Sequence, residues 1–216
     1  MPDIKHLDFN SPEIIYLCNK DKRLAKVIET VGPISYITHD NNPYAFLIHE
    51  VIEQMLSVKA GQAIFNRLSS LCNDDICCES INSLSIDQLR SIGISKAKAE
   101  YIMGITNAVL SGSLDFSVLD GLPDDTVIER LTSFRGIGNW TAKMYLIFVL
   151  DRPDILPYED GAFLQSYKWL YNTTDISSNE INKHCKKWSP YSSTAARYLY
   201  RALDYGMTKQ AFYSYK

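Results

Sequence analysis

The feature that most constrains this chain is the helical spacing of its apolar residues, which runs with short interruptions from residue 11 to residue 205. In YAFLIHEVIEQML, Phe46, Leu47, Val51 and Ile52 fall on one face of a helix with 3.6 residues per turn. The same spacing recurs in SPEIIYLCNK, DKRLAKVIETVG, SVKAGQAIFNRLSSL, SIDQLRSIG, SKAKAEYIMGITNAVLSG, PDDTVIERLTSF, TAKMYLIFVL, DGAFLQSYKWLY, SSNEINKHCKKW and YSSTAARYLYRALDYG. No stretch alternates apolar and polar residues convincingly, so the sequence predicts an all-α protein.

Composition places this helical chain among soluble globular proteins. Its 216 residues are 46% hydrophobic and 22% charged, which are ordinary proportions. We expect no signal peptide and no membrane span, since the apolar run WTAKMYLIFVL stops at Asp151. Five irregularly spaced cysteines fit a reducing compartment better than a disulfide framework. The expected location is the cytoplasm, with nucleoid association in a bacterium or a nuclear location in a eukaryote.

Charge is unevenly distributed along the chain, although the net charge is only −3. Residues 1–130 hold eleven Lys/Arg and eighteen Asp/Glu, whereas residues 131–216 hold eleven and seven. A locally positive face can attract a polyanion because charges are screened beyond roughly 10 Å. A merely solvated lysine-rich surface explains the composition equally well, so charge alone does not decide the partner.

The stretch FRGIGNWTAK, residues 134–143, joins two expected helices by a short glycine-containing turn. The first N–H groups of the second helix have no internal partner and lie at the positive end of its dipole, so they can hold a phosphate oxygen. A dinucleotide fingerprint fits poorly, because Thr141 stands at its third glycine position and a helix precedes the turn. A purely structural helical hairpin remains an equal alternative on the turn alone.

Four ordered stretches make the chain resemble the helix-hairpin-helix (HhH-GPD) DNA glycosylases, and among these the DNA-3-methyladenine glycosylase II group. They are NPYAFLIHEVIEQMLSVKAGQAIFNRL, LRSIGISKAKAEYI, LTSFRGIGNWTAKMYL followed by DILPYED, and KKWSPYSSTAARYLY. The resemblance implies two helical subdomains with a DNA cleft between them: residues 42–155, with the hairpin at 127–150, and residues 156–216 packed with residues 1–41. It also implies a set of DNA-binding residues: Arg135, Gly136, Ile137, Gly138, Asn139, Trp140, Thr141, Lys143, Ser95 and Lys96.

A carboxylate is the expected catalytic group. In the family, the essential aspartate ends a Pro-x-[Asp/Glu]-Asp stretch, which corresponds to Asp160 here, next to Glu159. Asp160 also precedes an expected helix, so capping that helix is its ordinary structural role. The two roles are compatible, since an ionised carboxylate beside a sugar can stabilise an oxocarbenium-like transition state and orient a water.

The residue after the glycine turn bears on the reaction type. Family members that also cut the strand carry a lysine there, which forms a Schiff base with the sugar. This chain has Trp140 instead, and we expect Lys143, three residues on, to be solvated or to face a phosphate. The resemblance therefore implies a monofunctional enzyme that releases alkylated purines such as 3-methyladenine or 7-methylguanine.

Aromatic residues are the candidates for the base pocket, because aromatic faces attract a flat cationic purine. Trp140 and Trp188 match family positions that border the pocket, and weaker candidates are Tyr44, Phe46 and Tyr158. Core packing is the alternative for all of them; we favour the pocket for Trp140 and the core for the tyrosines. A wedge must also fill the gap left by a flipped base. The resemblance places Lys96 at the matching position, where relatives carry an apolar side chain.

No cofactor is expected to be required. The histidines are scattered and the cysteines lack the spacing of a zinc or iron–sulfur site. The resemblance implies that hairpin carbonyls of Thr132, Phe134 and Ile137 hold a monovalent cation, Na⁺ or K⁺. The expected partner is double-stranded DNA containing alkylated bases, bound by a monomer. Two alternatives remain open: a catalytically silent DNA-binding protein, and an enzyme of the same fold that acts on oxidised or mispaired bases.

Overall fold

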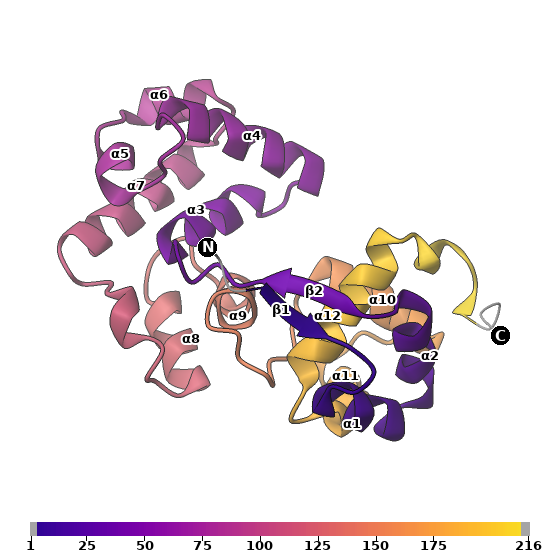
Figure 1. The fold of residues 1–216 in the computed structure, drawn as a ribbon. Coiled ribbons are helices and arrows are strands. Elements are labelled where there is room, and N and C mark those ends of the chain that lie inside the picture. Colours follow the sequence, from indigo (N-terminus) through magenta and orange to yellow (C-terminus); the bar gives the residue numbers. More distant parts are fainter. Residues whose placement is uncertain (1–3, 213–216) are drawn as a thin grey trace. The chain divides into compact units, whose positions relative to one another are not determined.

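The computed structural model describes residues 4–212 as a predominantly helical protein (Figure 1). The chain divides into two compact units, one formed by His39–Leu150 and the other by the segments up to Thr38 and from Asp151 onward. These boundaries lie three to five residues before those suggested by the sequence. None of the helices within residues 4–212 has both the length and the apolar character that crossing a bilayer requires.

The unit of residues 39–150 is built around α3 (Pro43–Glu53), which packs against α4 (Val58–Leu71), α7 (Lys96–Leu110) and α9 (Asn139–Phe148). The short helices α5 (Cys78–Asn82) and α6 (Ile86–Ser91) pack on α7, and α8 (Asp124–Thr132) packs on α9. A 3₁₀ turn, η1 (Phe116–Val118), lies between α7 and α8. Fully buried apolar residues of α3, α7 and α9, such as Leu47, Ile102 and Leu146, form its core.

The other unit combines the beginning and the end of the chain. Helices α1 (Pro12–Lys20) and α2 (Lys22–Val31) pack on each other, and α2 packs on α10 (Gly161–Tyr171) and α12 (Ser192–Asp204). Helix α11 (Ser178–Cys185) leads into η2 (Lys186–Trp188), and η3 (Met207–Lys209) follows α12. The largest side chains of this core are aromatic: Phe163, Tyr167, Trp188 and Tyr198 are at most 1% exposed.

Two short strands, β1 (Ile4–Leu7) and β2 (Ile34–Ile37), form an antiparallel pair in which Ile4 faces Ile37 and Leu7 faces Ile34. The sequence predicted no strand, and this prediction was wrong at these two segments. Each strand has only four residues, IKHL and ISYI, which is too short to show a clear alternation of apolar and polar residues. Their pairing is long-range, so it becomes visible only in the folded chain; the all-α class is confirmed.

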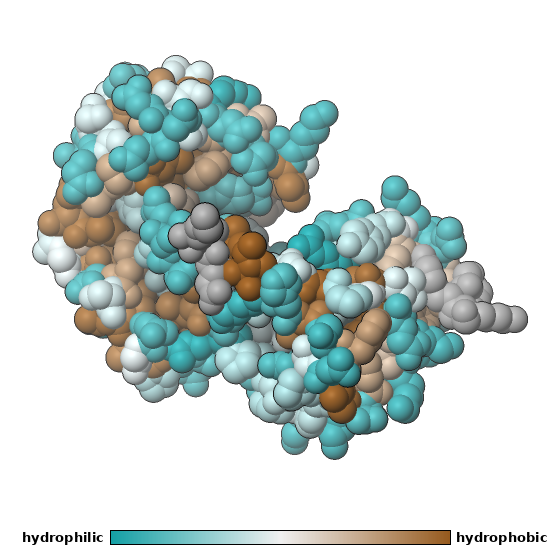
Figure 2. All heavy atoms as spheres, in the orientation of Figure 1, coloured by the Kyte–Doolittle hydropathy of each residue, from teal (hydrophilic) through white to brown (hydrophobic). Residues whose placement is uncertain are grey.

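Local signals place most helix ends where the sequence predicted them. The Ser57 side chain accepts a hydrogen bond from the Ala60 N–H and caps α4, and Gly32, Gly93 and Gly112 follow the ends of α2, α6 and α7 with positive φ. The visible faces of both units carry mixed hydrophilic and hydrophobic residues (Figure 2). Helix α5 was not predicted, because five residues are too few to show helical periodicity.

A buried aspartate joins the two ends of the chain in this second unit. Asp21 is 2% exposed and caps α2 by accepting hydrogen bonds from the Arg23 and Leu24 N–H groups. The Trp188 Nε1–H donates to Asp21 Oδ2 at 2.9 Å, the Tyr171 hydroxyl donates to the same oxygen, and Lys187 Nζ lies 3.1 Å from it. Burial raises the pKa of Asp21, but these hydrogen bonds outweigh it and hold the pKa below its usual value.

We expect Asp21→Asn to destabilise the protein by about 3 kcal/mol at pH 7, because it removes the charge that three buried or half-buried donors share. A depressed folded pKa contributes stability above the unfolded value of about 3.9, and this contribution is lost as pH falls through the folded pKa. The difference between variant and wild type in urea unfolding should therefore shrink at acid pH. The exposed turn residue Asp8, changed to Asn, is the matched control and should shift stability by less than about 0.5 kcal/mol.

Candidate functional site: a glycine hairpin and a helix-capping aspartate

The glycine hairpin lies within the unit of residues 39–150 and joins α8 to α9. Gly136 has φ +98°, a conformation that L side chains rarely adopt. A Cβ on Gly136 would lie 2.5 Å from Cβ and Cγ of Tyr101 on α7. The first glycine is therefore required by the turn itself and by close packing against another helix.

Gly138 differs from Gly136 in both respects. It has φ −100° and ψ 178°, which any residue can adopt, and a Cβ there would meet no atom within 4 Å. Gly138 occupies the N-cap position of α9, where no side chain caps the helix. The first N–H groups of α9 thus lie beside two exposed residues, Gly138 and Asn139. This arrangement is suited to binding an anion.

The other hairpin residues divide into an exposed and a buried group. Arg135 is exposed, and its guanidinium carbon lies 5.3 Å from the centre of the Tyr101 ring. Ile137 and Thr141 are buried, at 4% and 0% exposed. Lys143 is only 8% exposed, so of the two roles expected for it the solvated one was wrong, and the phosphate-facing one stays a prediction. It lies on the stretch of α9 in which every residue from Thr141 to Ile147 is buried.

Asp160 belongs to the other unit and occupies the N-cap position of α10. One carboxylate oxygen accepts a hydrogen bond from the Phe163 N–H at 2.7 Å, and the Asp160 N–H donates to the Pro157 carbonyl at 3.0 Å. These two bonds fix both the backbone and the rotamer of Asp160, which is half-buried. Glu159 is exposed and does not cap the helix.

The structure places most of the predicted pocket aromatics in the two cores. Trp188 is 0% exposed, makes an edge contact with Phe163 and donates to Asp21, so it forms part of the core of its unit. Tyr44 is 5% exposed and its hydroxyl is 2.7 Å from Thr106 Oγ1, in the other core. Trp188 therefore packs in a core, which was the alternative to a role in the pocket. Tyr44 lies in a core, as expected.

Three aromatics complete this set. Phe46 is 8% exposed and packs against the rings of His39 and Phe148. Tyr158 is half-buried and packs on the aromatic core of its unit. Trp140 is half-buried in the first turn of α9, directly after the hairpin glycines. Of the five predicted aromatics, Trp140 and Tyr158 thus retain surface that a ligand could reach.

The segment between α3 and α4, residues 54–57, is the part of this unit that the sequence did not single out as functional; we call it the α3–α4 tip. Met55, the second residue of the tip, has φ +59° and is fully exposed, at 102% of its reference area, and Leu56 is 42% exposed. A non-glycine residue with positive φ costs free energy, and such residues concentrate at functional sites. Nothing in the residue type of Met55 predicts this conformation.

The α3–α4 tip lies beside the loop before α7. The two line a cavity of about 160 Å³ with Ile52, Gln54, Met55, Leu56, Ile64, Gly93, Ile94, Ser95 and Lys98. Ser95 caps α7, Ile94 is 4% exposed, and Lys96 is exposed with Nζ 3.9 Å from Glu100. Lys96 is therefore an exposed residue at the start of α7, whereas Ile94, two residues before it, is buried.

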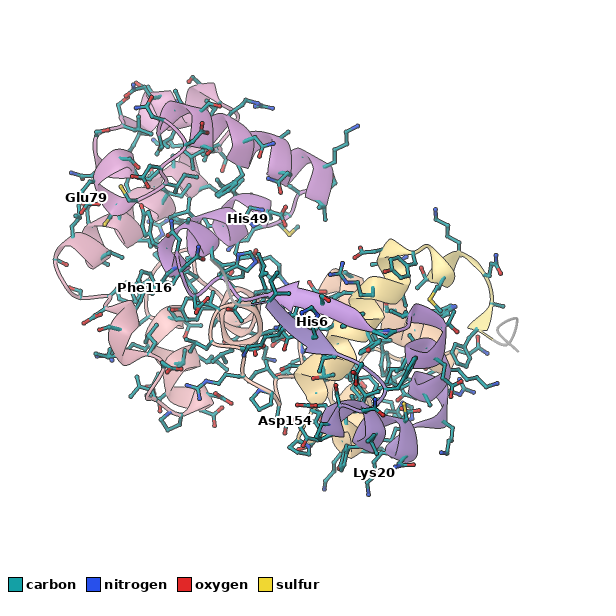
Figure 3. All side chains as sticks on the ribbon, viewed as in Figure 1. His6, Lys20, His49, Glu79, Phe116 and Asp154 are labelled. Atoms are coloured by element: carbon teal, nitrogen blue, oxygen red, sulfur yellow. The ribbon has the colours of Figure 1, made fainter. Side chains whose placement is uncertain are left out.

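One cluster of ionisable groups was not evident from the spacing of His and Cys, because two of its members are glutamates. His49 on α3 (Figure 3) lies with Glu50 and Glu53, and their ligand atoms are all within 4.8 Å of one another. His49 Nδ1 is 3.0 Å from Glu50 Oε1 and Nε2 is 3.5 Å from Glu53 Oε1. Burial lowers the pKa of His49, but the hydrogen bond to Glu50 and the charges of Glu50 and Glu53 raise it overall. Each ring nitrogen thus faces a carboxylate, which suits an imidazolium ion better than a metal ligand.

The hairpin and the capping aspartate can be compared with known proteins. Residues 48–190 match the family described as the HhH-GPD superfamily base excision DNA repair protein. The chain is 33% identical over 184 residues to DNA-3-methyladenine glycosylase 1 of Schizosaccharomyces pombe, a span that covers 83% of this chain and 80% of that protein. The chain belongs to the HhH-GPD superfamily of base excision DNA repair proteins.

Two solved structures resemble this fold closely. A DNA-3-methyladenine glycosidase from Bacillus halodurans is 37% identical with a TM-score of 0.79, over 92% of each chain. The 3-methyladenine DNA glycosylase Mag1 of Schizosaccharomyces pombe, solved in complex with abasic DNA, is 31% identical with a TM-score of 0.84. The match covers 94% of this chain and 99% of that one. The names of both proteins specify 3-methyladenine.

The two hairpin glycines provide a matched pair of substitutions. Gly136→Ala should destabilise the protein by about 2 to 4 kcal/mol, because it places an L side chain at positive φ and against Tyr101. Gly138→Ala should cost less than about 1 kcal/mol, since its backbone and surroundings accept a methyl group. Urea unfolding measures both; equal losses of stability would contradict the separate roles assigned to the two glycines.

Proposed function

We propose that this protein is a DNA glycosylase that hydrolyses the N-glycosidic bond of alkylated purines, of the 3-methyladenine and 7-methylguanine type, in base excision repair. The observation that carries the proposal is Asp160, a half-buried carboxylate fixed at the start of α10 in a chain of the HhH-GPD superfamily. The names of the relatives from Schizosaccharomyces pombe and Bacillus halodurans support the substrate class.

In the proposed reaction, water attacks C1′ of a flipped-out nucleotide while the C1′–N bond breaks. The purine leaves with the bonding electron pair, and because alkylation has made its ring cationic, it leaves as a neutral base. Asp160 stabilises the positive charge that develops on the sugar and takes the proton of the attacking water. Its capping bond from the Phe163 N–H holds the carboxylate in one rotamer, so little reorganisation precedes the reaction.

The hairpin is the proposed DNA anchor. The N–H groups after Gly138 bind a phosphate oxygen, and the absence of a side chain at Gly138 lets the strand approach. Exposed Arg135 and Asn139 add contacts to the DNA backbone, and Ser95 and Lys96, at the start of α7, contribute further contacts to it. The buried side chains of Ile137, Thr141 and Lys143 support the hairpin from within. Trp140 is the proposed aromatic border of the base pocket.

A wedge residue is proposed at Met55. Its side chain is unbranched and apolar, and the residue is fully exposed on the α3–α4 tip, as required of a group that enters the stack when a base is flipped. Lys96, the position suggested by the resemblance, is charged and lies within reach of Glu100. A charged wedge would be costly to insert among stacked bases.

We propose that carbonyl groups of the hairpin hold a monovalent cation. Thr132 is the last residue of α8, where carbonyls point out of the helix, and the Phe134 carbonyl accepts one hydrogen bond, from the Ile137 N–H at 3.1 Å. A carbonyl oxygen has two lone pairs, so Phe134 can also serve as a ligand together with Thr132 and Ile137. Such neutral oxygens suit Na⁺ or K⁺. The cation would supply positive charge at the hairpin; it takes no part in bond breaking.

The first experiment is to incubate the protein with methylated duplex DNA and identify released bases by chromatography. We expect 3-methyladenine or 7-methylguanine from the wild type, and a loss of release by at least a hundredfold in Asp160→Asn, which should still bind DNA. Glu159→Gln is the matched control and should retain activity, because Glu159 is exposed and caps no helix. Tight DNA binding without release of any alkylated base would instead indicate a silent binder or a different lesion.

A second prediction concerns the reaction type. Treatment with borohydride during turnover should trap no covalent protein–DNA adduct, because Trp140 occupies the position that carries a lysine in strand-cutting relatives and Lys143 is buried. A glycosylase with the lysine should form the adduct under the same conditions. An adduct that persists in Asp160→Asn and disappears in Lys143→Met would overturn the monofunctional assignment.

A further inference from the structure

The α3–α4 tip is tied to the DNA-anchoring hairpin by the side chain of Gln54. Its amide Nε2 donates to the Gly136 carbonyl at 2.8 Å and to Thr141 Oγ1 at 3.1 Å. These partners lie 82 and 87 residues away along the chain, on both sides of Gly138. One half-buried amide group therefore spans the turn that would hold the phosphate.

The main chain of the tip is held from the opposite side. Lys98 Nζ donates to the Ile52 carbonyl at 2.7 Å and to the Gln54 carbonyl at 2.5 Å, where the last carbonyls of α3 lack helical partners. The Leu56 N–H also donates to the Glu53 carbonyl at 2.9 Å. Gln54 is thus fixed through its backbone by α7 and through its side chain by the hairpin, immediately before Met55.

Both bonds come from one amide nitrogen, whose two N–H groups let Gln54 donate to Gly136 and Thr141 at the same time. Glutamate would set a carboxylate against the Gly136 carbonyl, and leucine would fill the space without donating. Thr141 is 0% exposed, so the bond to its hydroxyl lies where water does not compete with it. The two bonds therefore depend on a donor at position 54 and link the α3–α4 tip to the hairpin.

We propose that Gln54 is a positioning residue that sets the distance and orientation of Met55 relative to the phosphate-binding hairpin, so that anchoring of the strand brings Met55 into register with the flipped nucleotide. This inference rests on the proposed function and adds the residue that couples its two DNA contacts. Both N–H groups of the Gln54 amide are used within the protein, so the role assigned to Gln54 is exerted through Met55. A misplacement of about 1 Å at such a contact can cost as much as a hundredfold in rate.

The test uses a duplex that holds a tetrahydrofuran abasic analogue beside a 2-aminopurine, whose fluorescence changes when a side chain enters the stack. At saturating protein, we expect Gln54→Leu to lose at least half of the fluorescence change given by the wild type. Met55→Ala should lose it as well, and the double variant should lose no more than Met55→Ala alone, because Gln54 acts through Met55. Gln62→Leu on α4, an exposed amide that donates to Asn66, is the matched control and should behave as the wild type.

Measurements at saturating protein, together with thermal melting, distinguish a positioning role of Gln54 from an effect on protein stability alone. A merely structural role would lower the melting temperature and the folded fraction, but the folded protein would give the full change at saturation. A full change with Gln54→Leu, losses that add in the double variant, or no change with the wild type would each overturn the inference.

Base release from methylated duplex DNA distinguishes this failure from failure of the proposed function. We expect Gln54→Leu to release bases at least tenfold more slowly than the wild type and Gln62→Leu to match it. Normal release by Gln54→Leu together with a full fluorescence change would overturn the positioning role and leave the glycosylase assignment standing. The expected fluorescence pattern without release by the wild type would overturn the glycosylase assignment and leave the positioning role standing.

Discussion

The contact between the Gly136 turn and Tyr101 is the constraint on which the proposed DNA-binding unit depends. A left-handed residue without a side chain lets the hairpin lie directly against α7, where any Cβ would overlap the ring. With the turn held there, the Gly136 carbonyl comes within hydrogen-bonding distance of Gln54, and the helix that follows begins at an open glycine. The packing of Gly136 thus decides where the helix start at Gly138 presents the first N–H groups of α9.

The unit that carries Asp160 is organised around a different buried interaction. Asp21, in the N-terminal part of the chain, accepts hydrogen bonds from Tyr171 and Trp188 in the C-terminal part. These bonds join α1 and α2 to the helices around α10. A single buried carboxylate with several donors favours one arrangement of these helices over others, because any slippage would leave it unpaired. Asp160 is therefore displayed at the start of a helix whose body is locked into an aromatic core.

Individual residues show why the site could be predicted only in part. The positions of Asp160 and Gly138 at helix starts were predictable, because short motifs specify a helix cap and an open helix start, and both depend on neighbours within a few residues. Trp188 could not be assigned from its type, since a large aromatic serves a core and a pocket equally well until its partner Asp21 is known. Lys143 was misjudged because a lysine on an apolar helix is usually solvated, and only the packing on both sides of α9 buries it.

The sequence by itself determined the helical class, most of the helix ends and the motif that marks the superfamily, because these follow from periodicity, capping residues and glycine positions acting over a few residues. Only the tertiary structure decided the pairing of β1 with β2, the burial of Trp188 and Lys143, the exposed left-handed Met55, and the bonds of Gln54 across more than eighty residues. Each of these depends on contacts between segments far apart in the chain. Such contacts leave no periodic trace in the segments that make them.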